Sequence, residues 1–139
     1  PDNTGKNIAL LKKKGVYEIF VMTGENDFGS IPIGGDYKLF CKEGDTEIKL
    51  LGSFHKEYKP ISINDSAKEM STNIHYHSFG ASDFITPTDI CNLLLYKEFT
   101  QTKEHIVISE NYISIFNLEN IELYIYPKAQ YNKQNNTDY

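Results

Sequence analysis

The chain lacks tryptophan and contains only two cysteines, Cys41 and Cys91, which lie far apart. Their spacing fits neither a zinc-binding pair nor a disulfide framework. The cysteines therefore do not decide whether the protein is secreted or cytoplasmic. No apolar run is long enough to span a membrane, and no charged-then-apolar leader opens the chain. Acidic residues outnumber basic residues, which gives the chain a net charge of -5. This balance argues against nucleic acid and anionic membranes as main partners.

The remaining composition is that of a folded protein, with 40% hydrophobic and 24% charged residues. At 139 residues the chain is long enough to close one core without metals or crosslinks. We therefore predict a single domain over residues 1–130 and a polar C-terminal tail over residues 131–139. The start at Pro1, without methionine, suggests a mature product or a piece of a longer protein.

Periodicity and turn residues predict two helices and several strands. A short helix is expected over residues 4–15, where Thr4 could cap it and Gly15 could end it. A second helix is expected over residues 87–99, with Pro87 at its first position. Residues 55–72 are expected to form a loop with one helical turn around residues 64–70. Strands are expected over residues 16–24, 31–42, 46–54, 73–79, 104–118 and 121–127. This order indicates an α/β or α+β layer with a mixed or antiparallel sheet.

Histidine is scarce, and two of the four histidines stand two positions apart in the strand expected over residues 73–79. Side chains at i and i+2 of a strand project from the same face, so His75 and His77 should lie side by side. Asp89 follows in the first turn of the second predicted helix. Two imidazoles and a carboxylate are a donor set that binds a catalytic metal ion and leaves a position for water.

This pattern resembles the motif of the JAMM (JAB1/MPN+) metallopeptidases. In that family a glutamate on an early strand is followed by His-x-His-Pro, then by a spacer, and then by Ser-x-x-Asp. The closest resemblance is to divergent bacterial JAB-like domains of polymorphic toxins. Here Ser78 replaces the proline, Thr86 replaces the serine, and the spacer is one residue longer. The resemblance at the level of individual residues is limited to this motif. In the rest of the chain only the order of helices and strands is similar. It implies a JAB1/MPN-like mixed β-sheet flanked by helices.

The resemblance also implies a role for each matching residue. His75, His77 and Asp89 would be the ligands of Zn²⁺, and Thr86 would support the developing oxyanion. Water activated by the metal would attack the scissile carbonyl, with a glutamate as general base. The implied activity is hydrolysis of a peptide or isopeptide bond in a protein or peptide substrate. The oligomeric state stays open.

The general base has two candidates. Glu18 lies at the start of the first predicted strand, where the family places its glutamate. Glu25 lies at the following turn, with Gly29 shortly after it, as glycines follow in many members. Position relative to the first predicted helix favours Glu18.

Plainer interpretations exist for the same residues. The two histidines could be polar residues on an exposed strand face, and Thr86-x-x-Asp89 is also a capping box that needs no metal. His55 and His105 are expected at the surface, and Cys91 as a small core residue. The functional alternatives are a catalytically inactive MPN-like binding or scaffolding module and a secreted effector that carries the same site.

Overall fold

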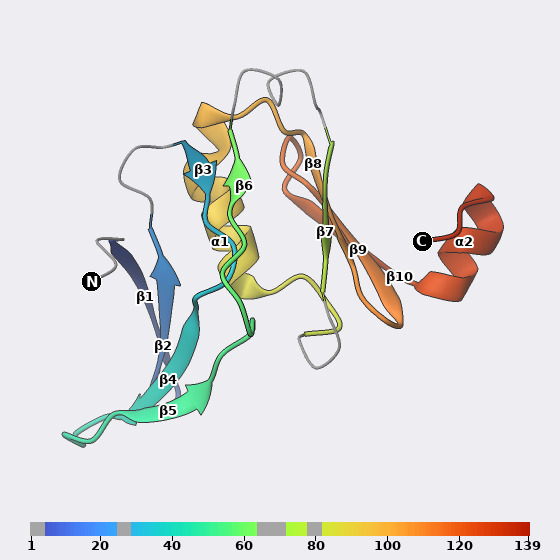
Figure 1. The fold of residues 1–139 in the computed structure, drawn as a ribbon. Coiled ribbons are helices and arrows are strands. Elements are labelled where there is room, and N and C mark those ends of the chain that lie inside the picture. Colours follow the sequence, from blue (N-terminus) through green and yellow to red (C-terminus); the bar gives the residue numbers. More distant parts are fainter. Residues whose placement is uncertain (1–4, 25–28, 64–71, 78–81) are drawn as a thin grey trace. The chain divides into compact units, whose positions relative to one another are not determined.

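The computed structural model describes residues 5–24, 29–63, 72–77 and 82–139 (Figure 1). Its fold is α+β, with more strand than helix, as the element pattern predicts. The contacts divide the chain into two compact units, Pro1–Ser62 and Ile63–Tyr139, where the sequence predicts one domain over residues 1–130. Among the described residues, no helix combines the length and the apolar character that crossing a membrane requires.

The first unit contains an antiparallel four-stranded sheet and a separate strand pair. The sheet order is β1-β2-β4-β5, and β3 pairs with β6. The strands are β1 (Lys6–Lys13), β2 (Val16–Thr23), β3 (Ser30–Ile31), β4 (Tyr37–Lys42), β5 (Lys49–Gly52) and β6 (Ile61–Ser62). The helical turn expected around residues 64–70 lies outside the described residues.

The helix expected over residues 4–15 is wrong, because β1 occupies most of this segment. Lys13 pairs with Val16, which leaves a two-residue connection of Lys14 and Gly15 with φ of 49° and 76°. Two positive φ angles are typical of the hairpin turn whose twist matches that of its strands, and glycine adopts this conformation without strain. Gly15 therefore belongs to a hairpin turn and does not end a helix.

The second unit is built around a four-stranded mixed sheet with the order β10-β9-β8-β7. Strands β7 and β8 are parallel, and α1 connects them, whereas the other neighbours are antiparallel. The expected strand before the loop and the helix that begins at Pro87 are both confirmed. The elements are β7 (Thr72–Tyr76), α1 (Pro87–Tyr96), a 3-10 turn (Lys97–Phe99), β8 (Glu104–Ile108), β9 (Tyr112–Asn117), β10 (Glu122–Pro127) and α2 (Lys128–Asn135).

One face of this sheet, here called the apolar face, packs against the C-terminal segment. Ile106, Ile108 and Ile113 are buried there as one cluster, and Tyr131 of α2 and Tyr139 pack against it. The segment predicted as a polar tail therefore begins inside α2 and contributes two aromatic rings to the core.

The opposite face carries polar residues and is here called the histidine face. The strand register places His75, His105, Val107, Ser114 and Phe116 on it. Except for the half-buried His75, these side chains are buried. The backbone N–H of Ile85, just before α1, donates to the Ser114 hydroxyl at 3.2 Å. The entry to α1 therefore lies over the histidine face.

Candidate metal centre

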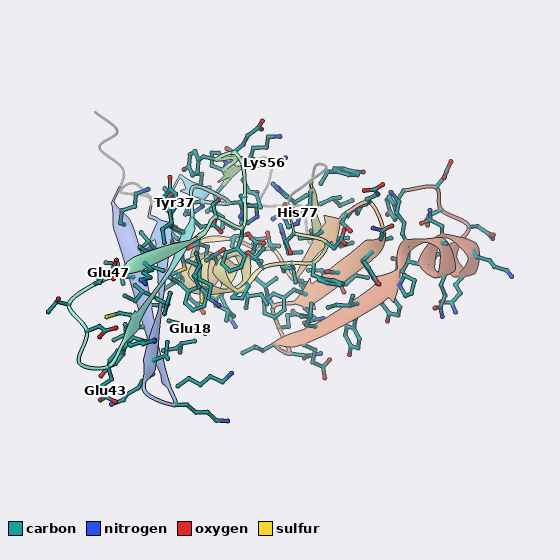
Figure 2. All side chains as sticks on the ribbon, turned by 90° about the horizontal axis from the view of Figure 1, so that it is seen from below. Glu18, Tyr37, Glu43, Glu47, Lys56 and His77 are labelled. Atoms are coloured by element: carbon teal, nitrogen blue, oxygen red, sulfur yellow. The ribbon has the colours of Figure 1, made fainter. Side chains whose placement is uncertain are left out.

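His77 lies directly after β7 (Figure 2) and is fixed at two points. Its backbone N–H donates to the carbonyl of Ile108 at 2.9 Å, which extends the pairing of β7 with β8. Its ring Nδ1 lies 2.7 Å from the carbonyl oxygen of Ser82. A carbonyl can only accept, so Nδ1 carries the proton, and a neutral ring presents its lone pair at Nε2. Metal-binding histidines are commonly oriented in this way.

Asp89 is held in the first turn of α1 by a complete capping box. Its backbone N–H donates to the Thr86 hydroxyl at 3.2 Å, and its Oδ2 accepts from the backbone N–H of Thr86 at 2.9 Å. The capping interpretation of Thr86-x-x-Asp89 is therefore confirmed. The hydrogen bond from the backbone N–H of Thr86 to Oδ2 fixes the orientation of the Asp89 carboxylate.

The Nε2 of His77 and the Oδ2 of Asp89 lie 3.9 Å apart, and both side chains are almost fully buried, at 2% and 1% exposure. This distance is too long for a hydrogen bond. Two ligands of one tetrahedral zinc ion lie roughly 3.4 Å apart, because each bond is about 2.0–2.1 Å long. The second unit thus brings together two buried donor atoms that could bind a metal ion.

His75 provides a second imidazole beside His77. The ring centres are 5.5 Å apart and the planes are nearly perpendicular, at 85°. Two imidazoles on one tetrahedral zinc ion have ring centres roughly 5 Å apart, given the same bond lengths. The ring of His75 is therefore a neighbour of His77, but within the described residues the donor atoms of His75, His77 and Asp89 do not all lie within 4.8 Å of one another.

Thr86 is occupied by its structural role. Its side chain is 1% exposed, and its hydroxyl lies 2.8 Å from that of Thr88 while it caps Asp89. An oxyanion donor must direct its hydrogen at the substrate oxygen. In this arrangement the hydroxyl of Thr86 is directed into the helix cap.

Glu18, the preferred general base, lies on β2 of the first unit (Figure 2). Its Oε1 accepts from the Lys38 ammonium on β4 at 3.0 Å, and both side chains are about one-third exposed, at 32% and 28%. A pair with this exposure contributes little to stability. The competing Glu25 and the replaced proline position, Ser78, lie outside the described residues.

His105 is a member of this neighbourhood that the sequence interpretation missed. It is 0% exposed, so its expected surface position is wrong. Burial lowers the pKa of His105 to about 4; the charge of Asp89 raises this pKa, and those of His75 and His77 lower it further. The unbroken apolar run Ile106-Val107-Ile108 indicates a strand buried on both faces, and this pattern could have revealed the burial of its neighbour.

His55, in the first unit, is also buried, where a surface position was expected. Its Nδ1 lies 2.9 Å from Oδ2 of the buried Asp36, and its backbone N–H donates to Oδ1 of the same carboxylate at 3.2 Å. A carboxylate at Nδ1 fixes the ring and its tautomer, as the Ser82 carbonyl does for His77. No sequence pattern links these two residues, which are brought together only by the fold.

Cys91, two positions after Asp89 on α1, is half-buried. Burial raises the pKa of its thiol above the ordinary value. A nucleophilic cysteine needs the opposite shift, toward the thiolate. The thiol is therefore protonated at neutral pH and does not serve as an activated nucleophile in this setting.

Comparisons of the chain with family models, curated proteins and solved structures found no match. The resemblance to the JAMM metallopeptidases accordingly stays a prediction from the residues quoted above.

Proposed function

We propose that the second unit binds a divalent metal ion through His75, His77 and Asp89, and that the protein is a JAMM-type zinc hydrolase. The observation that carries this proposal is the buried approach of His77 Nε2 to Asp89 Oδ2 at 3.9 Å. The carbonyl of Ser82 directs the lone pair of His77 to Nε2, which is the nitrogen that faces the carboxylate.

Zinc is the proposed metal because the donors are two imidazole nitrogens and one carboxylate oxygen, a set that occurs in catalytic zinc sites. When bound, zinc would supply a Lewis acid that polarises a carbonyl and acidifies water. The residues of the chain orient the donors: Ser82 sets the ring of His77, and Thr86 holds the carboxylate of Asp89. The burial of His77 and Asp89 limits the access of bulk water, which strengthens electrostatic interactions there.

The proposed substrate is a peptide or isopeptide bond in a protein, and the proposed fold is JAB1/MPN-like. Support for the fold comes from the order β7, loop, α1, closing strands in the second unit. The N-terminal element departs from the order that the resemblance implies, because it is the strand β1. The general base proposed on the resemblance is Glu18, with Glu25 as its competitor.

A second candidate function is a catalytically inactive MPN-like binding or scaffolding module. The specific observation in its favour is Thr86, whose buried hydroxyl caps α1 and contacts Thr88. If this hydroxyl does not reorient, the oxyanion loses the donor that the resemblance assigns to it.

Metal analysis tests the site directly. The chain, equilibrated with zinc and dialysed, should retain about one zinc ion per chain by mass spectrometry, as one three-ligand site requires. His77→Ala and Asp89→Asn should each lose it. Asp83→Asn is the matched control, because Asp83 is an exposed carboxylate near the start of α1. A wild-type chain that retains no zinc, or variants that retain it fully, would refute the site.

Hydrolysis then separates the two candidate functions. The probes are a quenched fluorescent peptide library and a pair of peptides joined by a lysine isopeptide bond. For a hydrolase, Glu18→Gln should keep the metal and lose turnover. Loss of turnover in Glu25→Gln instead would move the general base to Glu25. A metal-loaded wild-type chain that cleaves neither probe would favour the binding module.

A further inference from the structure

Strand β1 forms one edge of the four-stranded sheet in the first unit, and among the described strands only β2 pairs with it. The strand contains no proline, and its register with β2 is continuous over all eight residues, Lys6–Lys13. An edge strand presents a row of N–H and C=O groups with which another chain can pair. On its outer side β1 therefore offers a template for a further strand.

One hydrogen bond shows which residues of β1 direct their backbone toward this outer side. The N–H of Gly24 donates to the carbonyl of Gly5 at 2.9 Å, so Gly5 directs its carbonyl toward the neighbouring chain segment that continues β2. In an antiparallel pair, successive residues direct their N–H and C=O groups alternately toward the neighbour and away from it. Four residues of β1 therefore direct these groups outward: Lys6, Ile8, Leu10 and Lys12.

The side chains of the same four residues project from one face of the sheet and are exposed. Ile8 and Leu10, the middle two, are 68% and 58% exposed. Each is the end of a row of apolar side chains that crosses the sheet. The rows are Ile8-Val21-Tyr37 and Leu10-Ile19-Leu39-Leu50. Apolar side chains of an added strand would extend these rows and remove apolar area from water.

Lysines flank the two apolar residues on this face, although the chain as a whole has a net charge of -5. The Nζ of Lys6 donates to the Thr23 hydroxyl at 3.1 Å, and Lys12 forms an ion pair with Glu43. The side chains of Lys12 and Glu43 are 53% and 51% exposed. Because such an exposed pair contributes little to stability, Lys12 is able to contact a second carboxylate.

Charge decides which kind of strand suits this edge. If two copies of β1 paired antiparallel with Ile8 opposite Leu10, Lys6 would lie opposite Lys12. Like charges directly opposite each other destabilise a sheet, whereas opposite charges stabilise it. The edge therefore disfavours a second copy of the chain and favours a strand with acidic residues at these two positions.

We propose that β1 binds an extended acidic segment of a partner protein as an added antiparallel strand. Apolar side chains of the segment lie opposite Ile8 and Leu10, and acidic side chains lie opposite Lys6 and Lys12. Side chains on one face recur at every second residue, so the segment has the pattern acidic-x-apolar-x-apolar-x-acidic. Main-chain hydrogen bonds supply affinity, and the alternate side chains supply specificity. This inference goes beyond the proposed hydrolase function and does not depend on the metal centre.

Fluorescence anisotropy of the labelled peptide Glu-Thr-Val-Thr-Val-Thr-Glu, added to the full chain, tests the proposal. Binding should be saturable and should weaken with added salt, which screens exposed charges. N-methylation of the first valine, whose N–H faces β1 in this pairing, should weaken binding by about tenfold or more. N-methylation of the central threonine, whose N–H faces away, is the matched control and should change affinity by no more than a few-fold. Absence of saturable binding, or a threonine effect as large as the valine effect, would overturn the proposal.

Reversal of charge tests the role of the lysines. The double variant Lys6→Glu, Lys12→Glu should bind the acidic peptide about tenfold more weakly or less, because each facing pair changes from opposite to like charge. It should instead bind the peptide Lys-Thr-Val-Thr-Val-Thr-Lys. Lys49→Glu, Lys59→Glu is the matched control, since both are exposed lysines of the same unit that pair with a glutamate. This control changes the net charge equally and should keep the preference for the acidic peptide. An equal loss of affinity in both double variants would overturn the site at β1.

Amide hydrogen exchange locates the bound peptide without any variant. In the free chain the N–H groups of Ile8 and Leu10 should exchange faster than that of Ala9, which faces β2. The acidic peptide should slow exchange at Ile8 and Leu10. A peptide that leaves both rates unchanged would overturn the proposal. Slow exchange at both residues in the chain alone, increasing with its concentration, would assign the edge to a second copy and overturn the proposal as well.

Discussion

The two faces of strands β8 and β9 are both buried and yet differ in chemistry. On the apolar face, Ile106, Ile108 and Ile113 form a continuous cluster against the C-terminal segment. On the histidine face, the same strands present His105 and Ser114, both at 0% exposure. A strand directs alternate side chains to opposite sides, so one stretch of sequence serves both faces.

The difference separates stability from chemistry within one sheet. Burial of apolar area on one face contributes stability in proportion to the area removed from water. On the other face, burial of the His105 imidazole costs free energy, because its ring nitrogens have no hydrogen-bond partner within the described part of the chain. The first face offsets the cost of the second, and substitutions on the two faces should therefore have separable effects.

The largest expected effect on stability comes from the apolar face. Ile113→Ala should lower the free energy of unfolding by about 2–5 kcal/mol, because it leaves a cavity in a fully buried cluster. Cobalt affinity of the folded protein should stay unchanged, since the side chain lies on the face away from His105. Urea denaturation and cobalt titration measure the two quantities. Ile125→Ala, at a position 43% exposed on β10, is the control and should cost far less.

If Ile113→Ala reduced cobalt affinity as strongly as it reduced stability, the two faces of β8 and β9 would act as one cooperative unit and not as two independent ones.

The next effect concerns pH and belongs to the histidine face. The pKa of His105 is lowered to about 4 from its ordinary 6.5, so the folded state disfavours the protonated ring. Protonation below pH 6.5 therefore favours the unfolded chain, and stability falls as the pH decreases from about 6.5 to about 4. The loss amounts to about 3 kcal/mol at most, from the size of the shift.

The measurement is urea denaturation at pH 7 and pH 4.5 in the presence of a chelator, for the wild-type chain and for His105→Leu. Other titrating groups contribute to both proteins, so the difference between the two pH dependences isolates His105. An equal loss of stability in both proteins would contradict the prediction.

The smallest effect concerns the helix that follows the loop at the histidine face. Thr86→Ala removes the hydroxyl that caps α1 and should cost about 1 kcal/mol of stability. Thr86→Ser keeps the hydroxyl and should recover most of this loss, as thermal or urea denaturation would show. If the serine variant were as unstable as the alanine variant, the methyl packing of Thr86 would outweigh its capping role.

Local patterns predicted the second unit well. Thr86, Pro87 and Asp89 mark the start of α1 in three adjacent signals, and the structure begins the helix at Pro87. Alternation of apolar residues likewise predicted strand structure over residues 104–118 and 121–127, although the structure divides the first of these ranges into β8 and β9. These elements were predictable because their signals lie within a few residues of one another.

Features that depend on distant residues were not predictable in the same way. The segment that became β1 ends in lysines and Gly15, a pattern that suits a helix end as well as a hairpin, and its pairing with β2 decides between them. The burial of His105 depends on β7, β9 and the approach of α1, and the contact of His55 with Asp36 depends on the fold of the first unit. His55 has no local signature that distinguishes it from a surface residue, and the local sign for His105 is the apolar run Ile106-Val107-Ile108 that follows it.

The parallel pairing of β7 with β8 has a consequence for the order of folding. Thr72 pairs with Glu104, so β7 acquires its only sheet neighbour among the described strands after the intervening α1 has been placed. Contacts between residues so distant in sequence form slowly, because the chain must close a large loop first. A nascent chain that has not yet emerged beyond β8 could hold His75 and His77 but not bring them to their final positions. The position of His77, whose backbone N–H donates to the carbonyl of Ile108, is therefore fixed only after β8 has been synthesised.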